Sequence, residues 1–461
     1  MNSLFEFLIK LDNLVWGPPM LILLMGTGIF LTIRTHFAAW KNLFHAIKYS
    51  FGVDSMNSKS GEGDISPFSS LTTSLAATIG TGNIVGVATA ITAGGPGAIV
   101  WMLISSAFGL TTKLAECLLA VKYREINMNG EMCGGPMYTI KNAFKNKFAA
   151  KILAWLFALF TVIASFGIGN MTQSNSVSEA LCASFDIPKE ITGIAVTVLS
   201  LIILVGGIKS ISKVTQYLVP FMSAAYIFMS VLVLWANREL LIPGIALIMK
   251  SAFSVSAISG GLCGNMTVAA FSALRCGIAR GCFSNEAGMG SAAISAAAAS
   301  TDSAAKQGYI SMTGVFWDTF VVCTITGLCI VCSGSLVLTN PTTGQGYTGA
   351  ALTMAAFSTV LGNIGSTSVS IGIALFAFST ILGWEYFGEK AFEYMTKTQK
   401  YNYTYRIIFC LTAYTGATLN LNLVWSFSDI ANALMCLPNL LCLIVLNKEI
   451  VCELKNFDSK K

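Results

Sequence analysis

The chain has 461 residues, of which 54% are hydrophobic and 11% are charged, and its mean hydropathy is +0.69. This composition excludes an ordinary soluble domain and indicates an all-α polytopic membrane protein. The net charge of +6 comes from lysines and arginines near the ends of apolar stretches, which favours anchoring in a lipid bilayer over nucleic-acid binding.

Apolar stretches long enough to cross the hydrocarbon core, about 20 residues each, occur about eleven times. They cover residues 15–33, 66–93, 97–121, 150–182, 190–208, 214–236, 265–300, 308–336, 366–388, 404–421 and 424–446. The first has neither a basic leader nor a small-residue cleavage site, so we interpret it as a retained helix, with the mature chain beginning at Met1. The seventh is long and contains Arg275 and Arg280. We expect residues 1–461 to form one transmembrane domain.

Basic residues follow alternate predicted spans. After spans one, three, five and nine, and at the end of the chain, the sequence has Arg34, Lys41, Lys48, Lys59, Lys122, Arg124, Lys141, Lys145, Lys147, Lys151, Lys209, Lys213, Lys390, Lys397, Lys400, Lys448, Lys455, Lys460 and Lys461. The stretch 337–365 has no charged residue. Because basic loops stay on the cytoplasmic side, we expect a multi-pass protein of the cytoplasmic (inner) membrane of a prokaryote, with its N-terminus outside and its C-terminus in the cytoplasm.

The second span contains a glycine-rich break. Residues 74–97 read SLAATIGTGNIVGVATAITAGGPG, with Gly80-Thr81-Gly82-Asn83 in the middle. A helix that stops and restarts inside a bilayer leaves backbone amides and carbonyls that lipid cannot satisfy. In secondary transporters such breaks hold a small polar or ionic ligand near mid-membrane. The alternative is that these glycines serve helix packing, since Gly82 and Gly86 form a GxxxG pair.

A second break is predicted in the seventh span, in ARGCFSNEAGMGSAAISAAAA. The residues that interrupt this small-residue helix are Gly281, Ser284, Asn285, Glu286, Gly288 and Gly290. Each break opens a block of five spans, 66–236 and 265–446, and because five is odd the two blocks cross the membrane in opposite directions. Two broken helices at matching positions in opposed halves indicate an inverted-repeat secondary transporter with its site between the breaks.

Several long motifs, in order, carry a family resemblance over nearly the whole chain. They are WGPPMLILLMGTGIFLTIR, SLAATIGTGNIVGVATAITAGGPGAIVWM, GGPMYTI, FGIGNMTQSNS, ARGCFSNEAGMGSA and FSTILGWEYFGE. Together they resemble the alanine/glycine:cation symporters, which are sodium-coupled importers of small amino acids. The resemblance implies an additional first helix, 15–33, followed by the 5+5 inverted repeat shared with neurotransmitter:sodium symporters. It also implies import of alanine or glycine with Na⁺ by alternating access, and no enzymatic activity.

An amino acid in a low-dielectric site needs separate partners for its carboxylate, its ammonium group and its side chain. The amides of Thr81 and Gly82 suit the carboxylate, because they lie at the positive end of a half-helix. Asn83 either contacts the ligand or an ion, or caps the broken helix. Gln173, in an otherwise apolar span, either joins helices by a hydrogen bond or faces a cavity. The resemblance implies that Gln173 meets the polar end of the substrate.

Two aromatic residues, Phe283 and Trp384, are expected to form the walls of the substrate site. Most aromatic side chains in such a protein pack against helices or lipid, and Trp often lies at the membrane interface. The resemblance favours the pocket, because the tryptophan that matches Trp384 lines the substrate site in the family. An indole and a phenyl ring close together leave room for little more than a methyl group, so alanine or glycine is the expected substrate.

The cation is expected between the first break and the ninth span. The break exposes carbonyls near Ala76 and Ile79, and Ser379 and Thr380 offer adjacent hydroxyls. Such oxygens are hard ligands that suit an alkali cation, whereas serine and threonine also commonly bond back to their own helix. Similarity to the wider inverted-repeat class implies that these four residues hold Na⁺, with Thr380 also among the substrate-binding residues. No cofactor is expected besides this coupling ion.

Proton coupling is the alternative within the transporter class. The two histidines, His36 and His45, follow the first span, away from the predicted site, so the sequence offers no histidine relay. Three carboxylates lie at membrane depth, namely Glu116, Glu286 and Asp318, and intramembrane acids are functional candidates. We interpret Glu116 as a structural ion pair with the lysine three residues earlier. For Glu286 and Asp318, gating pairs and coupling residues are equally open.

Other classes of protein agree less with the sequence. An intramembrane enzyme needs a nucleophile with a base, and Ser284 beside Glu286 is the nearest arrangement. A channel needs a continuous polar lining, whereas two opposed breaks suit an occluded site. The chain has no nucleotide-binding loop of the GxxxxGK[ST] type, which argues against ATP-driven transport. We expect a monomer or weak dimer that binds a small amino acid, Na⁺ and lipid.

Overall fold

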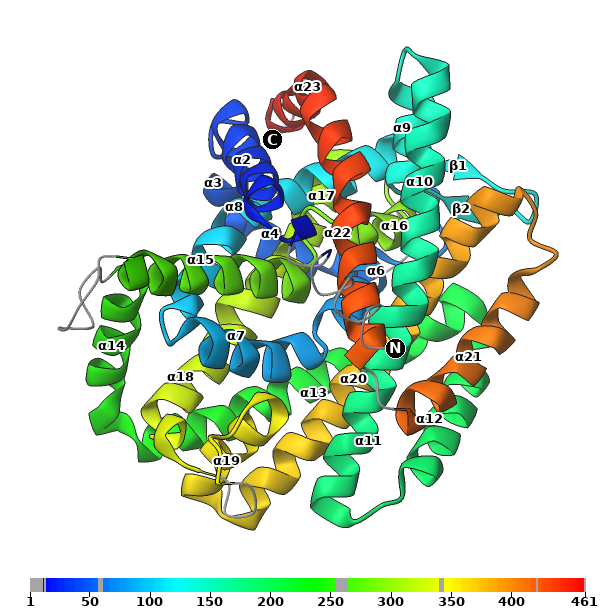
Figure 1. Ribbon diagram of the computed structural model, residues 1–461. Coiled ribbons are helices and arrows are strands. Elements are labelled where there is room, and N and C mark those ends of the chain that lie inside the picture. The colour runs from blue at the N-terminus through cyan, green and yellow to red at the C-terminus, as the bar shows by residue number, and fades with distance from the viewer. Residues whose placement is uncertain are drawn as a thin grey trace.

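Helices make up almost all of the secondary structure. The computed structural model describes residues 11, 14–56, 61–253, 264–339, 344–419 and 422–459. Within these residues one short hairpin occurs, in which β1 Glu125–Ile126 pairs antiparallel with β2 Met132–Cys133. Figure 1 shows the helices crossing one another around a common centre. The predicted all-α polytopic class is confirmed.

Some sequence predictions fall outside the described part of the chain. They concern Met1 as the start of the mature protein, the basic residues Lys59, Lys460 and Lys461, and the last residues of the predicted span 404–421.

The first part of the chain runs from the N-terminal helix to a helix pair that ends near residue 236. Its elements are α2 Pro18–Arg34, α3 Ala38–Lys41, α4 Leu43–Ser50, α5 Val53–Met56, α6 Pro67–Thr78, η1 Gly82–Gly86, α7 Val87–Gly94, α8 Ala98–Lys122, α9 Pro136–Ala143, α10 Lys147–Phe166, η2 Gly167–Met171, α11 Thr172–Phe185, α12 Lys189–Leu204 and α13 Gly207–Ala236. Helices α2, α6 and α9 begin with proline, where its missing N–H is not needed by the helix.

The predicted break in the second span is confirmed. Helix α6 ends at Thr78, the π-helical turn η1 starts at Gly82, and the two halves are bent by 50°. Ile79 leaves the helical conformation with ψ 84°. At the other end of α6, the Ser66 side chain accepts a hydrogen bond from the Ser69 amide at 3.1 Å and caps the helix.

The second part of the chain has the second broken helix and the longest helix. Its elements are η3 Arg238–Leu240, α14 Leu241–Phe253, α15 Gly264–Asn285, α16 Ser291–Ala297, α17 Ala304–Val315, η4 Phe316–Cys323, α18 Thr324–Cys332, η5 Ser335–Val337, α19 Gly349–Leu361, α20 Asn363–Thr396, α21 Asn402–Thr418, α22 Asn422–Val445 and α23 Asn447–Asp458.

The second break is shorter than predicted. Gly281, Ser284 and Asn285 lie inside α15, and only the segment from Glu286 to Gly290 is non-helical. Gly281 stays helical because it serves packing: a Cβ there would lie 2.8 Å from the Ser105 hydroxyl on α8. The prediction that all six polar and small residues interrupt the helix is therefore wrong for these three.

The number of membrane spans agrees only partly with the prediction. Among the described residues, five helices are long and apolar enough to cross a membrane, or seven if each of two bent pairs is one span. Three further helices at predicted positions, α2, α12 and α21, have 17, 16 and 17 residues. The count of about eleven spans and the division into repeats 66–236 and 265–446 stay predictions.

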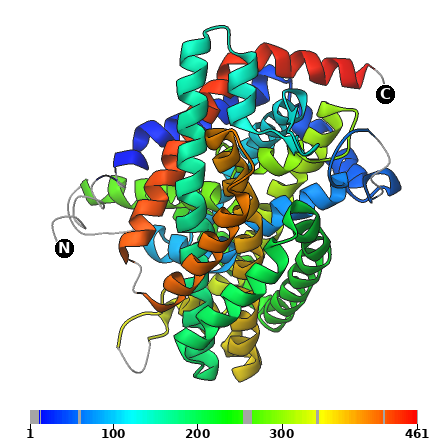
Figure 2. The same ribbon diagram turned by 90° about the vertical axis from the view of Figure 1, so that its right-hand side faces the viewer.

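Several short helices were not predicted, because the search for stretches of about 20 apolar residues passes over them. Helices α14 and α19 have 13 residues each, and α19 lies in the uncharged stretch 337–365. Helix α23 has 12 residues and follows α22 after a bend of 63°. In both views α9 and α23 lie at one end of the molecule and α19 at the opposite end (Figures 1 and 2).

The broken helix α6–η1–α7 lies at the centre of the packing. Helix α6 contacts α13, α16, α17 and α20, and η1 contacts α15, α19 and η4. Helix α8 packs on α15 and α17, and α10 packs on α20 and α22. This packing brings the two breaks and the middle of α20 together.

Candidate substrate and sodium site

A small cavity lies between the two broken helices. Its walls come from the first break, η2 and α11, α15 and the second break, α20 and α22, and they are Ala77, Thr78, Gly80, Gly82, Ile168, Gln173, Phe283, Glu286, Thr380, Trp384 and Asn432. The cavity volume is about 10 Å³, room for about one water molecule, which is far below the range typical of sites for drug-sized ligands. Five of the predicted substrate-binding residues line it, namely Gly82, Gln173, Phe283, Thr380 and Trp384.

Thr81 and Asn83 lie next to the cavity but do not line it. The Thr81 hydroxyl donates to Gln173 Oε1 at 3.0 Å. Asn83 Oδ1 accepts from the Gly80 amide at 3.0 Å, and its Nδ2 donates to Asp318 Oδ1 at 2.6 Å. The side chain of Asn83 therefore has the geometry of a cap on the broken helix, one of the two roles that the sequence left open.

Gln173 combines both of its predicted roles. Its side chain lines the cavity, accepts from Thr81, and donates through Nε2 to the Ile168 carbonyl at 2.9 Å. The second bond occupies a carbonyl of η2, where the π-helical turn disturbs the regular ladder. The second half of the first broken helix begins at Gly82, with Thr81 as its N-cap, so its first amides lack acceptors within the helix and the positive end of its dipole lies at the cavity wall.

The two predicted wall residues are both held in place. Trp384 is 2% exposed, and its indole Nε1 donates to Glu286 Oε1 at 2.9 Å. Phe283 faces Gly82, where a Cβ would lie 3.3 Å from the phenyl ring. The Arg280 guanidinium lies 5.4 Å from the centre of the same ring. Phe283 also lines a second cavity, together with Arg280 and Asp429.

Three of the four predicted cation ligands converge. The hydroxyls of Ser379 and Thr380 donate to the Ala76 carbonyl at 3.2 and 3.1 Å. Both also donate to the Phe376 carbonyl of their own helix, at 2.8 and 3.0 Å. Ile79 ends α6 beside this group, but the described hydrogen bonds do not join it to the hydroxyls. A cluster of hard oxygens therefore lies between the first break and α20.

Side chains from distant helices satisfy the second break. Lys113 Nζ donates to the Asn285 carbonyl at 2.8 Å, at the C-terminal end of α15, where a positive charge is favoured. Glu116 Oε1 accepts from the Gly288 amide at 2.8 Å, and Asn439 donates to the Gly288 carbonyl at 2.9 Å. These contacts replace the backbone bonds that the break loses.

One prediction about the buried acids is wrong. Lys113 and Glu116 form no ion pair within 4.0 Å among the described residues, because each is bound to the second break instead. Glu286 and Asp318 are both buried near the site. Glu286 lines the cavity, and Asp318 lies behind the first break, where it binds Asn83.

Six of the cavity residues were not among the predicted site residues, namely Ala77, Thr78, Gly80, Ile168, Glu286 and Asn432. Glu286 was predicted as a gating or coupling acid and not as a cavity residue, and its position inside a glycine-rich break was the signal for it. Asn432 comes from α22, far along the chain, and nothing in its neighbourhood distinguishes it from other polar residues of the span. Only packing brings it to the cavity.

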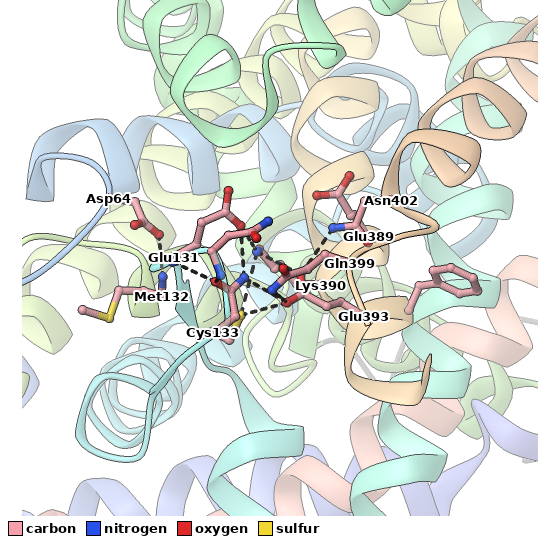
Figure 3. A network of polar contacts seen from close by, with 12 residues as sticks. Asp64, Glu131, Met132, Cys133, Glu389, Lys390, Glu393, Gln399 and Asn402 are labelled. Atoms are coloured by element: carbon pink, nitrogen blue, oxygen red, sulfur yellow. Dashed lines mark hydrogen bonds and ion pairs between the residues drawn. The ribbon is translucent and has the colours of Figure 1, made fainter. Parts of the chain in front are cut away.

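A charged network closes the end of α20 beyond the cavity (Figure 3). Lys390 is 2% exposed, and its Nζ lies 2.8 Å from Glu131 Oε2 and 3.1 Å from Glu393 Oε2. Asn127 donates to both carboxylates at 3.2 and 3.0 Å. The six residues from Trp384 to Lys390 span about 9 Å along the helix, so this network ties the β1–β2 hairpin to the helix that carries the site.

Comparison with known proteins identifies the family. A sequence model of the sodium:alanine symporter family matches residues 1–461. The chain belongs to this family. It is 47% identical over 447 residues to the sodium/alanine symporter AgcS of Methanococcus maripaludis, covering 97% of this chain and 96% of that protein. Membership in this family of transporters supports sodium-coupled amino-acid symport and rules out the enzyme interpretation.

Two solved structures share the fold. A manganese transporter of Eremococcus coleocola has a TM-score of 0.51 at 15% identity, covering 86% of this chain and 81% of that one. A Na⁺-coupled sialic acid symporter in a substrate-bound outward-open state has a TM-score of 0.50 at 12% identity, covering 95% and 86%. Both are polytopic transporters, which agrees with the predicted fold class.

Proposed function

We propose that this symporter imports a small neutral amino acid, alanine or glycine, together with Na⁺ by alternating access. The observation that carries the proposal is the contact of the Ser379 and Thr380 hydroxyls with the Ala76 carbonyl, directly beside a small cavity between two broken helices. Thr380 belongs to both the oxygen cluster and the cavity wall, so ion and substrate share a residue.

The cavity supports a small substrate. Phe283 and Trp384 narrow it, and its volume of about 10 Å³ leaves no room for a long side chain. The substrate carboxylate is assigned to the amides of Thr81 and Gly82, with Gln173 beside them. Asn83 caps the broken helix through its hydrogen bond with the Gly80 amide. The relative named for alanine, 47% identical over nearly the whole chain, supports the same substrate class.

The residues present are suitable for Na⁺. Carbonyl and hydroxyl oxygens from Ala76, Ser379 and Thr380 are hard ligands, and we assign the Ile79 carbonyl as the fourth. No cofactor besides this ion is proposed. Moving one net charge with a zwitterion is worth about 2.3 kcal/mol per 100 mV, which supports roughly fifty-fold accumulation, since about 1.4 kcal/mol is tenfold.

The positions of the basic residues support one orientation in the membrane. We assign α9, α23 and the β1–β2 hairpin to the cytoplasmic side of the inner membrane, with the N-terminus outside, because basic residues such as Lys122, Arg124, Lys141 and Lys448 lie in these segments or directly beside them. We further propose that the protein acts as a monomer or weak dimer that contacts lipid and no nucleic acid.

The test is uptake of labelled alanine into proteoliposomes that contain the purified protein. A Na⁺ gradient is expected to drive saturable accumulation that a choline gradient does not, and an inside-negative potential is expected to increase it. Accumulation that follows an imposed pH gradient without Na⁺ would replace the sodium mechanism by proton coupling. Absence of saturable uptake of alanine, glycine and serine would contradict the substrate class.

A further inference from the structure

We propose that Glu286 and Asn432 form the binding site of the substrate's ammonium group and so restrict the transporter to ligands that carry a free amine. The inference rests on the proposed amino-acid function and adds the residues that select for the amine. It starts from two acceptors in one cavity, a carboxylate and an amide oxygen, that come from the second break and from α22.

The backbone of Glu286 has a left-handed conformation, and the residue lies at the cavity wall. Its φ is +55°, a left-handed conformation that disfavours a side chain with a Cβ. Such a residue persists when its surroundings demand the conformation, and it is often found at binding sites. Here α15 ends one residue earlier, and the left-handed turn directs the next segment away while the carboxylate remains buried at the cavity wall.

The carboxylate of Glu286 has room for a further donor. Oε1 accepts from the Trp384 indole at 2.9 Å, and Oε2 accepts from the Ser291 hydroxyl. Both partners are neutral, and a carboxylate offers about four lone-pair positions. The carboxylate is 2% exposed, and the Lys113 ammonium acts on it from a distance while bonded to the Asn285 carbonyl. A cation in direct contact with the carboxylate is therefore still favoured, because a buried charge is stabilised by a paired counter-charge.

Asn432 supplies an acceptor that lacks a donor. It is 1% exposed and lines the same cavity, and its Oδ1 has no hydrogen-bond partner within the described part of the chain. A buried amide oxygen without a donor is costly, so a ligand that donates to it gains affinity. An ammonium group has three N–H donors, enough for Asn432 and Glu286 together.

The cavity has a negative and a positive pole, which match the two charged groups of a zwitterionic amino acid. Among the residues that line it, Glu286 is the charged one, and it comes from the second break. The opposite pole is the start of the second half of the first broken helix, at Gly82 in the cavity wall and Thr81 beside it, where the positive end of the helix dipole lies. One break therefore binds the ammonium group and the other the carboxylate, which orients a zwitterion and disfavours a monocarboxylate.

The experiment measures binding to the purified full-length protein by its thermal stabilisation in NaCl and in choline chloride. Wild-type protein is expected to bind alanine in Na⁺, and to bind propionate, which lacks the amine, at least thirtyfold more weakly. Glu286→Gln is expected to weaken alanine binding at least thirtyfold and Asn432→Ala about five- to tenfold. Stabilisation by Na⁺ alone should persist in both variants. The control Glu179→Gln removes an exposed carboxylate and should bind as wild type.

The outcomes separate this inference from the function on which it rests. Suppose that Glu286→Gln is still stabilised by Na⁺ and binds alanine within threefold of wild type. This result would overturn the ammonium-binding role of Glu286 and leave the transporter function intact. If Glu286→Gln does not fold, the wild-type comparison decides, because propionate that binds as tightly as alanine overturns the inference. Wild-type protein that binds neither alanine nor glycine in Na⁺ would contradict the proposed function and this inference together.

Discussion

The side-chain amide of Asn83 donates to the carboxylate of Asp318 across 2.6 Å and joins the first break to η4. The same carboxylate accepts from the hydroxyls of Ser284 on α15, at 2.9 Å, and Thr319, at 2.7 Å. All four side chains are buried. Both broken helices are thereby attached to one buried acid, so movement of either break must rearrange the bonds of Asp318.

Asp318→Asn is expected to lower both stability and transport. The amide that replaces the carboxylate accepts at only one of its two terminal atoms, so one of the present donors loses its acceptor. Because hydrogen bonds to charged groups contribute about 1.5–3 kcal/mol each, the unfolding free energy should fall by a similar amount. The rate of alanine uptake should fall more than tenfold. Asp186→Asn, an exposed residue with φ +53° that asparagine tolerates, is the control. Uptake within twofold of wild type would contradict the role of this link.

Trp384→Ala is expected to change substrate selectivity. Removing the indole enlarges the cavity and leaves Glu286 without its 2.9 Å donor, so alanine should bind more weakly while bulkier neutral amino acids compete better. Competition for labelled alanine uptake by a series from glycine to leucine measures the change. The control Trp155→Ala removes a tryptophan that is 45% exposed. Unchanged selectivity would remove Trp384 from the substrate site.

Ser379→Ala and Thr380→Val are expected to weaken the response to sodium. Each removes one hydroxyl that now contacts the Ala76 carbonyl, and the loss of one hydrogen-bonding oxygen, about 1 kcal/mol, corresponds to a roughly fivefold higher half-saturating Na⁺ concentration. Ser366→Ala, whose hydroxyl bonds to its own helix at 3.1 Å, is the matched control on α20. Sodium dependence equal to wild type would mean that the two hydroxyls only bond back to Phe376.

Lys390→Met is expected to destabilise the end of α20. It leaves Glu393, which is 5% exposed, without its cation, and breaking a buried pair from one side costs about 3–5 kcal/mol. The double variant with Glu393→Gln should recover part of this loss, because no unpaired buried charge remains. Thermal unfolding of the two variants measures the difference. Equal stability of the single and double variants would contradict the ion pair as the cause.

Acid is expected to loosen the hairpin from α20 through Glu131. Burial acts to raise the pKa of Glu131, but the Lys390 ammonium and the Asn127 amide outweigh it, so its pKa is below the ordinary 4.5. The stability from this group is therefore present above pH 4.5 and is lost as the pH falls below it. Thermal unfolding across this range should show a smaller acid loss in Glu131→Gln. Burial raises the pKa of Asp64, so the contribution of Asp64 to stability increases as the pH falls. Because Asp64 is unchanged in Glu131→Gln, the difference between this variant and wild type reports the Glu131 carboxylate alone.

Local sequence predicted the positions of both breaks but not the extent of the second. At Gly80 to Asn83, glycines and an asparagine follow each other within one span, and backbone geometry there depends on these neighbours. Gly281 carries the same signal but stays helical, because α8 approaches it closely. A glycine that permits close packing and a glycine that ends a helix are indistinguishable until the neighbouring helix is placed.

The sequence by itself determined the membrane class, the family and the presence of two broken helices, because hydropathy, motif order and helix propensity are properties of contiguous residues. Only the tertiary structure decided what the breaks contact. Lys113 and Asn439 bind the second break, and Glu286, Trp384 and Asn432 meet in one cavity, although they come from separate elements. Burial makes each polar group take a partner, but packing alone decides which partner is within reach.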